Sequence, residues 1–223
     1  MATATRETPT SRKPDLSVNF CGITFKNPVI AAAGTFGYGI EFEDIVTLEK
    51  LGGFVTKGLS REPMVGNPPP RLFETAAGML NSIGLQNIGA RPFIEEKLPK
   101  LAKKKNVVVI ANVFGYTREE YVETIRILNE AEGIAAYELN VSCPNTSHGG
   151  MVFGTDRVAL EELVASCKGA AQRPLIVKLS PNVTSIPSMA NRRRTPEQTP
   201  SRWSTPSSAW RSTPKRASRV FQI

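Results

Sequence analysis

One cysteine of this chain stands where a thiol could act as an acid or a base. Cys143 lies in the segment Asn140-Val-Ser-Cys-Pro-Asn145, directly after a short apolar run. Proline restricts its own backbone and that of the residue before it, so this loop is expected to be stiff. A free cysteine is commonly buried packing, but it acts in proton transfer if its pKa falls towards neutrality. Both interpretations stay open on this ground.

Four polar residues follow directly after apolar runs at equivalent positions: Lys57, Asn112, Asn140 and Lys178. A single polar residue at the end of a strand needs no functional explanation, because strands often end at the surface. Four amide or ammonium groups at matching positions are harder to explain in that way. If the strand ends converge, these groups predict a site for an anionic, heterocyclic ligand. Two further polar loops accompany them: the proline-rich Gly58–Arg71, expected to lack regular structure, and Asn81–Asn87.

The elements that would position these residues alternate between strand and helix. Apolar runs predict five strands, at Val29–Ala33, Gly53–Thr56, Val107–Ala111, Tyr137–Leu139 and Leu175–Val177. Apolar residues at three- and four-residue spacing predict helices at Pro92–Lys105, Arg118–Glu132 and Asp156–Ala171. Thr155 or Asp156 is suited to cap the last of these helices.

Alternating strands and helices predict an α/β fold with a parallel sheet. The strands are continuously apolar, so both faces of the sheet should be buried. A doubly wound sheet and an eight-stranded TIM barrel both satisfy this pattern. The polar residues at the strand ends favour the barrel, because all the strands of a barrel point their carboxyl ends at one mouth.

Several stretches resemble the class 1 dihydroorotate dehydrogenases, most closely the catalytic subunit of the NAD-linked type B enzymes. They occur in family order between residues 16 and 185. The matching stretches are Asn27–Gly39, Thr56–Gly58, Gly66–Arg71, Asn81–Leu85, Asn140–Asn145, His148–Asp156 and Val177–Pro181. Other classes of the family place serine where this chain has Cys143. The resemblance implies a TIM (β/α)8 barrel that holds FMN at its mouth.

The resemblance also implies roles for individual residues. Cys143 would be the catalytic base. The residues implied to bind FMN are Ala33, Gly34, Lys57, Gly58, Asn112, Asn140 and Lys178. Those implied to bind the pyrimidine are Lys57, Asn81, Ser82, Ile83, Gly84, Leu85 and Asn140.

The chemistry implied by the resemblance is the oxidation of dihydroorotate to orotate in pyrimidine (UMP) biosynthesis. The thiolate takes a proton from C5, and N5 of the flavin accepts a hydride from C6. Lysine and amide donors stabilise the charge without a metal. In type B enzymes the electrons pass towards NAD through a partner subunit with FAD and an iron–sulfur cluster, and a homodimer within a heterotetramer is implied. This chain, with three cysteines, lacks the ligands for a cluster of its own.

The net charge of +8 is concentrated in the last part of the chain. Residues 186–223 hold seven arginines and one lysine against one glutamate, a net charge of +7 that leaves +1 for the first 185 residues. This segment is rich in Ser, Thr and Pro and has no apolar period, so we expect it to be a disordered basic tail. The alternative is a nucleic-acid-binding or membrane-surface protein that uses this tail. Out-of-frame peptide is the preferred interpretation, so neither nucleic acid nor membrane is an expected partner.

A frameshift between about Ile186 and Thr195 explains the tail. With GC-rich codons, reading Thr195–Pro214 one nucleotide upstream yields an apolar strand followed by the Asn-Thr pair that the family places against orotate. We therefore divide the chain into a lead-in (1–15), about five β/α units of a barrel (16–185) and a non-native tail (186–223). Five strands cannot close a barrel. We expect the first and fifth strands to be unpaired edges, and the chain to fold poorly, hold FMN weakly and turn over little substrate.

The cysteines and the N-terminus indicate the compartment. Three cysteines that are far apart in sequence argue against a disulfide framework, and His148 as the only histidine argues against a zinc site. The polar N-terminus is no secretory signal, and no apolar run approaches the length that spans a bilayer. We expect a cytoplasmic enzyme without a bound metal. A related flavin barrel, such as a dihydropyrimidine dehydrogenase domain, is an open alternative because it shares the cysteine loop.

Overall fold

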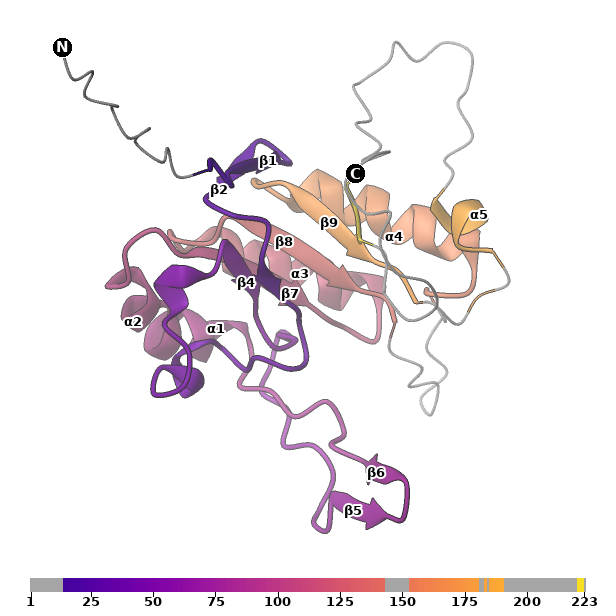
Figure 1. Ribbon diagram of the computed structural model, residues 1–223. Helices are drawn as coiled ribbons and strands as arrows, with labels where there is room; N and C mark the ends of the chain where they lie inside the picture. The colour runs from indigo at the N-terminus through magenta and orange to yellow at the C-terminus, as the bar shows by residue number, and fades with distance from the viewer. Residues whose placement is uncertain (1–13, 143–152, 181–182, 184, 191–219, 223) are drawn as a thin grey trace, which may run out of the picture.

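The computed structural model describes residues 14–142, 153–180, 183, 185–190 and 220–222 (Figure 1). Its centre is a sheet in which five neighbouring strands run parallel, in the order β9-β8-β7-β4-β3. The strands are β3 (Ile30–Ala31), β4 (Gly53–Val55), β7 (Val108–Val113), β8 (Ala136–Asn140) and β9 (Leu175–Lys178). All five strands expected from the sequence are therefore confirmed, and so is their parallel arrangement.

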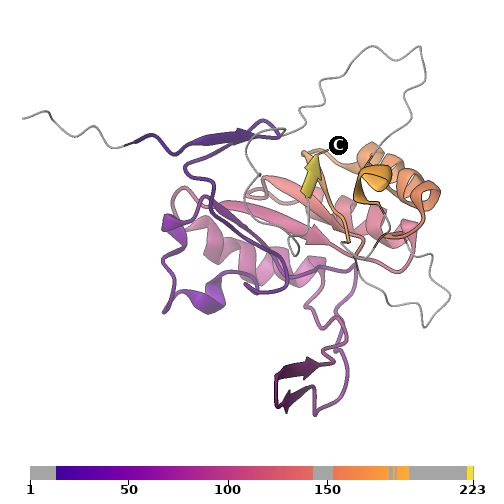
Figure 2. The ribbon, with the colours of Figure 1, turned by 45° about the vertical axis from the view of Figure 1, so that its right-hand side comes forward.

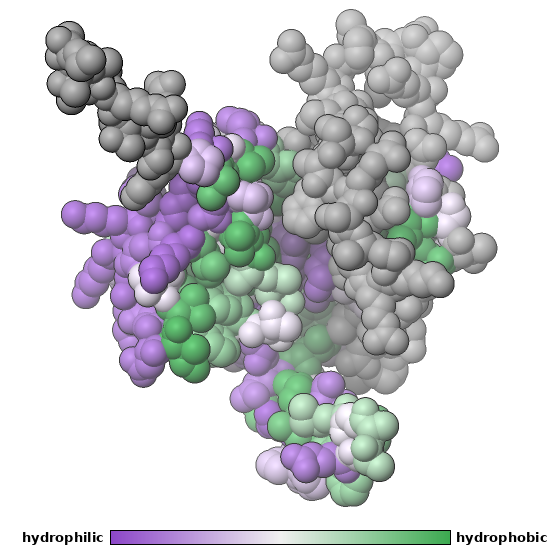
Figure 3. Space-filling model, viewed as in Figure 1, coloured by the Kyte–Doolittle hydropathy of each residue, from purple (hydrophilic) through white to green (hydrophobic). Residues whose placement is uncertain are grey.

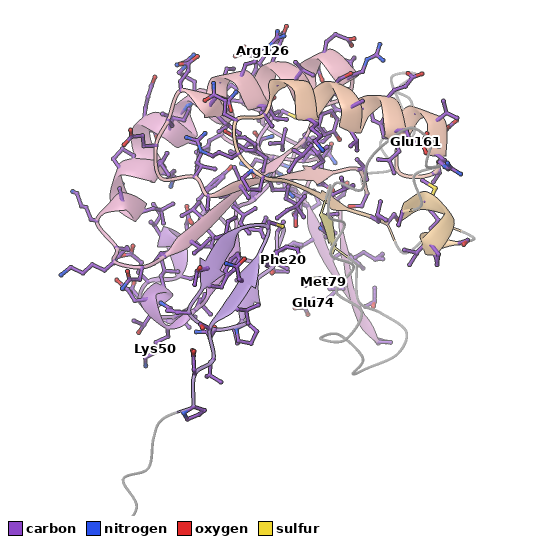
Figure 4. All side chains as sticks on the ribbon, turned by 90° about the horizontal axis from the view of Figure 1, so that it is seen from above. Phe20, Lys50, Glu74, Met79, Arg126 and Glu161 are labelled. Atoms are coloured by element: carbon purple, nitrogen blue, oxygen red, sulfur yellow. The ribbon has the colours of Figure 1, made fainter. Side chains whose placement is uncertain are left out.

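Helices cover one face of this sheet. The two long helices, α3 (Arg118–Asn129) and α4 (Arg157–Ala170), pack against each other. Viewed from above, Arg126 of α3 and Glu161 of α4 lie on the outside of this helical layer (Figure 4). Two short 3₁₀ helices, η1 (Ile40–Phe42) and η2 (Leu48–Lys50), lie between β3 and β4 in the sequence.

The helix expected at Pro92–Lys105 is not continuous. It consists of α1 (Ala90–Pro92), the π-helical turn η3 (Phe93–Lys97) and α2 (Leu98–Ala102). Pro99 lies in the first turn of α2, and proline lacks the amide hydrogen that would continue an α-helix from the preceding turn. Of the Lys103–Lys105 run, Lys103 caps α2 at its C-terminus and Lys104 forms an ion pair with Glu43 at 3.3 Å.

Both long helices begin at capped residues. Thr117 and Glu120 form a capping box at the start of α3, in which each side chain satisfies a backbone amide of the other residue. The Asp156 carboxylate accepts hydrogen bonds from the amides of Val158 (2.8 Å) and Ala159 (3.0 Å). Asp156 is thus confirmed as the cap of α4. These caps fix where each helix starts relative to the strand that precedes it.

The two faces of the sheet bury two separate apolar clusters. The larger cluster includes Phe54, Val109 and Tyr137 of the strands together with side chains of all the long helices. The smaller cluster lies on the other face and contains strand residues that alternate with those of the first; it also takes in the hairpin residue Phe25. Its strand members are Val55, Ile110, Ala136 and Ile176. No helix residue joins the smaller cluster among the described residues, so this part of the chain is not a doubly wound sheet.

Two antiparallel hairpins were not expected from the sequence. The first pairs β1 (Val18–Phe20) with β2 (Ile23–Phe25), and its side chains pack against the smaller cluster. The second pairs β5 (Leu72–Thr75) with β6 (Gly78–Asn81) and projects away from the sheet in both views (Figures 1 and 2). Its large apolar side chains are exposed, as the green surface of the projection shows (Figure 3).

The edge next to β9 differs from the expectation. We expected β9 to be an unpaired edge, but β10 (Val220–Gln222) pairs with it in antiparallel orientation, with Phe221 opposite Val177. A short helix, α5 (Ile186–Ala190), packs Ile186 and Met189 against the larger cluster. Both elements fall in the range expected to be a disordered tail, and the expectation of an unpaired β9 is wrong. The remaining residues of that range lie outside the described part of the chain, so the domain boundary at 185 stays a prediction.

The described elements form a partial barrel. A curved parallel sheet with all its helices on one face is the wall of a TIM barrel, whose interior is filled by side chains of the helix-free face. The β1–β2 hairpin covers part of this face. Five parallel strands occur among the described residues, so a closed eight-stranded barrel stays a prediction. Within the same residues, every helix is too short or too polar to span a bilayer.

Candidate active site

A layer of polar side chains lies on the helix-free face of the sheet, at the carboxyl ends of the strands. It follows from the two-residue alternation of a strand, because residues two or four positions beyond those of the smaller apolar cluster point to the same side. The layer consists of Lys57, Asn112, Glu138, Asn140 and Lys178. The four polar residues expected from the sequence are therefore brought to one edge of the sheet, on one face. We call these five residues the polar layer.

The register of the strands sets the neighbours within the polar layer. Asn112 of β7 lies opposite Glu138 of β8, and Asn140 of β8 lies opposite Lys178 of β9. On the other side of β7, the Leu59 amide donates to the Asn112 carbonyl at 2.8 Å. This bond draws Lys57 and Gly58, the residues before Leu59, to the end of β7.

Asn112 is the most constrained member of the polar layer. Its side chain is fully buried, and its Nδ2 donates a hydrogen bond to Glu138 Oε1 at 2.7 Å. Its backbone amide donates to Thr56 Oγ1 at 3.0 Å. The Oδ1 atom is buried and has no hydrogen-bond partner within the described residues. A Cβ atom added at Gly58 would lie 3.3 Å from this oxygen, so a side chain at this position would crowd Oδ1.

Glu138 carries a buried carboxyl group in the polar layer. It is 4% exposed, and this burial raises the pKa of Glu138 above its ordinary value. The hydrogen bond from Asn112 and the positive charge of Lys178 act in the opposite direction and favour the ionised form. The polar layer therefore combines two lysines, two amides and one carboxyl group.

Asn140 ends β8 and begins the loop that carries Cys143. Its Oδ1 accepts hydrogen bonds from the Ser142 hydroxyl (2.7 Å) and amide (3.4 Å), and its carbonyl accepts one from the Tyr121 hydroxyl (2.7 Å). The described chain stops at Ser142 and resumes at Phe153, next to Gly154. A Cβ at Gly154 would lie 2.2 Å from the Val141 carbonyl, so both ends of this loop lie against each other. Cys143 itself lies outside the described residues.

The segment after β3 reaches the same edge of the sheet. Ala33 packs against the smaller apolar cluster, and Gly34 adopts a positive φ of 90° that favours glycine. Further along, the Gly37 carbonyl accepts a hydrogen bond from the Lys57 amide at 2.7 Å. This segment therefore lies next to Lys57 at the strand ends, and the flavin-binding role of Ala33, Gly34 and Lys57 stays a prediction.

The segment expected to bind the pyrimidine, Asn81–Leu85, lies on an arm and not in the polar layer. Residues 64–87 form a two-stranded arm that runs outwards from the strand ends, with Met64 opposite Asn87 near its base and Leu72 opposite Asn81 in the projecting hairpin. Glu74 and Met79 mark this hairpin in Figure 4. Asn81 and Ser82 are exposed on the arm, and Ser82 binds Asn67 of the same arm rather than the polar layer. Ile83, Gly84 and Leu85, further along the arm, are partly buried. The substrate-binding role of these five residues stays a prediction.

Asn87 fixes the base of the arm. It is 6% exposed, and its Oδ1 accepts hydrogen bonds from Ser60 Oγ (2.9 Å), the Ser60 amide (3.2 Å) and the Gly89 amide (2.8 Å). Ser60 follows Leu59, which pairs with β7. The arm is therefore attached next to the polar layer at its base.

The two described cysteines are poorly suited to proton transfer. Burial raises the pKa of both the Cys21 and the Cys167 thiol to about 12. Cys21 lies in the turn of the first hairpin and Cys167 on the buried face of α4. Both thiols are therefore protonated at neutral pH, which leaves Cys143 as the candidate base. No group of histidine, cysteine or carboxylate side chains that could hold a metal ion occurs in the described part of the chain.

Glu138 and Asn87 are site residues that were not identified from the sequence. A signal for Glu138 exists, because a glutamate inside an apolar strand, two positions before Asn140, must share its face. Asn87 was seen only as the end of a polar loop, and nothing in the sequence indicates that its side chain is the acceptor for Ser60.

Comparison with known proteins adds to this geometry. A family model described as dihydroorotate dehydrogenase matches residues 15–198. The chain belongs to the dihydroorotate dehydrogenase family. A putative dihydroorotate dehydrogenase A (fumarate) of Solibacter usitatus is 62% identical over 177 residues, which are 79% of this chain and 58% of that protein.

Dihydroorotate dehydrogenases named for another electron acceptor are also similar. The catalytic subunits of dihydroorotate dehydrogenase B (NAD(+)) from Pelobacter propionicus and Geotalea uraniireducens are 56% and 54% identical to this chain. Each match covers 80% of this chain and 58% of the relative. The resemblance to the family, including its type B catalytic subunits, is confirmed, and the chain spans 58% of the length of these relatives.

The residues of the polar layer fit FMN, the flavin that dihydroorotate dehydrogenases bind. An isoalloxazine ring presents carbonyl oxygens and ring nitrogens, which the Lys57 and Lys178 ammonium groups and the amide of Asn140 can satisfy as donors. It also carries an N–H group, and the unpartnered Asn112 Oδ1 is a buried acceptor next to Gly58, which has no side chain to crowd it.

Proposed function

We propose that this chain contributes the FMN-dependent oxidation of dihydroorotate to orotate in pyrimidine (UMP) biosynthesis. The observation that carries the proposal is the polar layer, which gathers two lysines and two asparagines at the strand ends of a chain from this family. The ligand chemistry agrees with it. Dihydroorotate is an anion with ring carbonyl and N–H groups, and ammonium and amide groups recognise these features.

Lys57, Gly58, Asn112, Asn140 and Lys178 are the proposed flavin-binding residues, with Ala33 and Gly34 against the ring. Bound FMN supplies the acceptor for the hydride that leaves C6 of the substrate. Lys57 and Asn140 are proposed to bind the substrate as well. Their donors stabilise negative charge that develops on the pyrimidine as the proton leaves.

Cys143 is the proposed base that removes the proton from C5 of dihydroorotate. A thiolate is required for this step, so the pKa of Cys143 must lie closer to neutrality than that of the two buried cysteines. Its position supports the role: it follows Ser142, whose hydroxyl binds the Asn140 side chain of the polar layer. Asn81, Ser82, Ile83, Gly84 and Leu85 are proposed to contact the pyrimidine, which requires the arm to approach the strand ends.

The electron acceptor is proposed to be NAD, reached through a partner subunit with FAD and an iron–sulfur cluster. Several relatives named as type B catalytic subunits support this assignment. A relative named for fumarate supports the other type, so the acceptor is decided by experiment. Reduction of NAD by the flavin-loaded enzyme only when an FAD- and iron–sulfur-bearing subunit is added would support type B. Direct turnover with fumarate would contradict it.

The described residues contain five parallel strands, whereas a closed barrel has eight. We propose that the 223-residue chain therefore binds FMN weakly and turns over little dihydroorotate. We also keep the frameshift between about Ile186 and Thr195 as a proposal. Sequencing the gene tests it, because an intact frame without a family-like downstream reading would contradict the frameshift.

A chimera tests the function itself. Residues 1–185 are joined to the remaining C-terminal part of the Pelobacter propionicus relative, which is 56% identical to this chain. We expect the chimera to bind FMN and to form orotate from dihydroorotate, and the same chimera with Cys143→Ala to bind FMN but form no orotate at neutral pH. A flavin-loaded chimera that oxidises dihydrouracil and not dihydroorotate would contradict the proposal in favour of a dihydropyrimidine dehydrogenase. Full activity of the 223-residue chain alone would contradict the proposed impairment.

A further inference from the structure

Glu138 is a buried acid with no assigned role in the polar layer. Its side chain lies on β8 between Ala136 and Asn140, on the helix-free face of the sheet, and is 4% exposed. Burial of a carboxylate is unfavourable unless the group is paired and hydrogen-bonded. Glu138 has one such hydrogen bond, from Asn112 Nδ2 at 2.7 Å, and the positive charge of Lys178 nearby; both oppose the effect of burial, which still raises the pKa of Glu138.

The amide of Asn112 has two ends, and only one of them is satisfied. Nδ2 donates to Glu138, while Oδ1 is buried and unpartnered among the described residues. The other unpartnered buried side-chain atom in the described part of the chain is Arg71 Nε, on the projecting arm. Among the described residues, Asn112 Oδ1 is thus the unsatisfied buried acceptor at the strand ends, and it lies next to Gly58, which has no side chain to crowd it. A donor from a bound ligand would satisfy it.

We propose that Glu138 is a positioning residue that fixes the orientation of the Asn112 amide, so that Oδ1 accepts a hydrogen bond from a ring N–H group of the bound ligand. This inference rests on the proposed function, in which the ligand is FMN. An ionised carboxylate accepts hydrogen bonds and cannot donate them. Ionised Glu138 therefore holds Asn112 with Nδ2 towards the carboxylate, the orientation that the 2.7 Å contact has, and Oδ1 is left as the acceptor for the ligand.

Glutamate and glutamine at position 138 would differ in how firmly they fix the orientation of the Asn112 amide. Glutamine can both accept and donate, so the pair with Asn112 forms in two ways. In one of them Nδ2 of Asn112 still donates; in the other the amide is reversed and its Nδ2 faces the ligand. Two donors, Nδ2 and a ring N–H, would then oppose each other. Burial raises the pKa of Glu138, and the positive charge of Lys178 acts against this shift and so favours the ionised form that holds the single orientation.

The first test measures the amide itself, in the full 223-residue chain without ligand. Side-chain amide protons of ¹⁵N-asparagine-labelled protein are followed by hydrogen exchange, and the Asn112 pair is assigned by its loss in Asn112→Leu. We expect exchange to become faster by on the order of tenfold in Glu138→Leu and Glu138→Gln, because a charge-assisted hydrogen bond is lost. Two variants are used so that a folding defect in one leaves the test decisive.

The second test measures FMN affinity by quenching of flavin fluorescence in the same chain. We expect Glu138→Gln to weaken FMN binding by on the order of tenfold. The matched control is Thr124→Val, which removes another buried hydrogen bond, from Thr124 Oγ1 to the Glu120 carbonyl, on the outer helix α3. This control should leave the affinity unchanged within about twofold. If Glu138 acted only by stabilising the fold, Glu138→Gln and Thr124→Val would change the FMN affinity by the same factor.

The outcomes separate this inference from the proposed function. Unchanged exchange of the Asn112 amide in both Glu138 variants would overturn the inference, as would exchange in the wild-type chain as fast as in free asparagine. Equal FMN affinities in Glu138→Gln and Thr124→Val, or no FMN binding by the wild-type chain, would overturn the part of the inference that gives Asn112 Oδ1 a hydrogen bond from FMN. If both tests succeed but the chimera forms no orotate, the proposed function fails while the positioning role of Glu138 for FMN is retained.

Discussion

Asn112 and Glu138 face each other on neighbouring strands, and the amide of the first donates to the carboxylate of the second at 2.7 Å. Both side chains are buried, so this contact is formed away from water. It joins β7 to β8 at the point where the smaller apolar cluster, with Ile110 and Ala136, gives way to the polar layer. The same pair of residues therefore links two neighbouring strands and belongs to the candidate site.

The stability of the chain should depend on pH through Glu138. Burial raises the pKa of Glu138 above its ordinary value, so its contribution to stability is fully present below that value and is lost as pH rises through the folded pKa. Glu138→Gln has no such titration. We expect the free energy of unfolding of the wild type, relative to this variant, to fall between acidic and neutral pH. Urea denaturation at several pH values measures it, and a difference that is constant with pH would contradict the raised pKa.

The capping box of α3 should contribute measurably to stability. Thr117→Ala removes the acceptor for the Glu120 amide, a hydrogen bond of 3.2 Å, and is expected to lower the free energy of unfolding by about 1 kcal/mol. Thr117→Ser keeps a hydroxyl at this position and is the matched control. Urea denaturation compares the three chains. Equal losses in both variants would show that the side-chain cap is not the cause.

The base of the arm should depend on Asn87. Asn87→Ala leaves the backbone amides of Ser60 and Gly89 without their acceptor, while the Ser60 hydroxyl keeps the Glu62 carbonyl, and we expect a loss of about 2–3 kcal/mol in the free energy of unfolding. Limited proteolysis should then cut residues 64–87 faster. Asn67→Ala is the control, because Asn67 binds Ser82 on the exposed part of the arm. Equal proteolysis of both variants would contradict the assigned role of Asn87.

The three cysteines should differ in reactivity. Burial raises the pKa of the Cys21 and Cys167 thiols to about 12, so their thiolate forms are scarce at neutral pH. We expect iodoacetamide to alkylate Cys143 first in the folded chain, as read by mass spectrometry of peptides. Unfolding in urea should make all three cysteines react at similar rates. Preferential alkylation of Cys21 or Cys167 in the folded chain would contradict Cys143 as the base.

The parts of the fold that could be predicted are those with a periodic signal. The five parallel strands come from continuous apolar runs, the helices α3 and α4 are long and apolar on one face, and Asp156 is a typical helix cap. The first hairpin was missed because its turn is Cys21-Gly22. Both residues have positive φ, of 58° and 74°, as a two-residue hairpin turn requires. Asparagine or aspartate is the usual partner of glycine there, so cysteine hides the signal.

The candidate site was predicted less completely than the fold. Lys57, Asn112, Asn140 and Lys178 were found because each follows an apolar run, and the parallel register brings them together. Glu138 was missed because it lies inside its strand, where only the two-residue alternation reveals the face it shares with Asn140. The position of Asn81 on a projecting arm had no local signal, because it depends on pairing with Leu72 and on the attachment at Asn87.

The affinity of the 223-residue chain for FMN tests the central claim, that the polar layer binds a flavin, most directly. Quenching of FMN fluorescence is compared for the wild type, Lys178→Met and the control Lys168→Met, whose lysine is exposed in the last turn of α4. We predict that Lys178→Met binds FMN about tenfold more weakly than the wild type, and that Lys168→Met matches the wild type. Equal affinities of the three chains, or no quenching by the wild type, would contradict a flavin site at these strand ends.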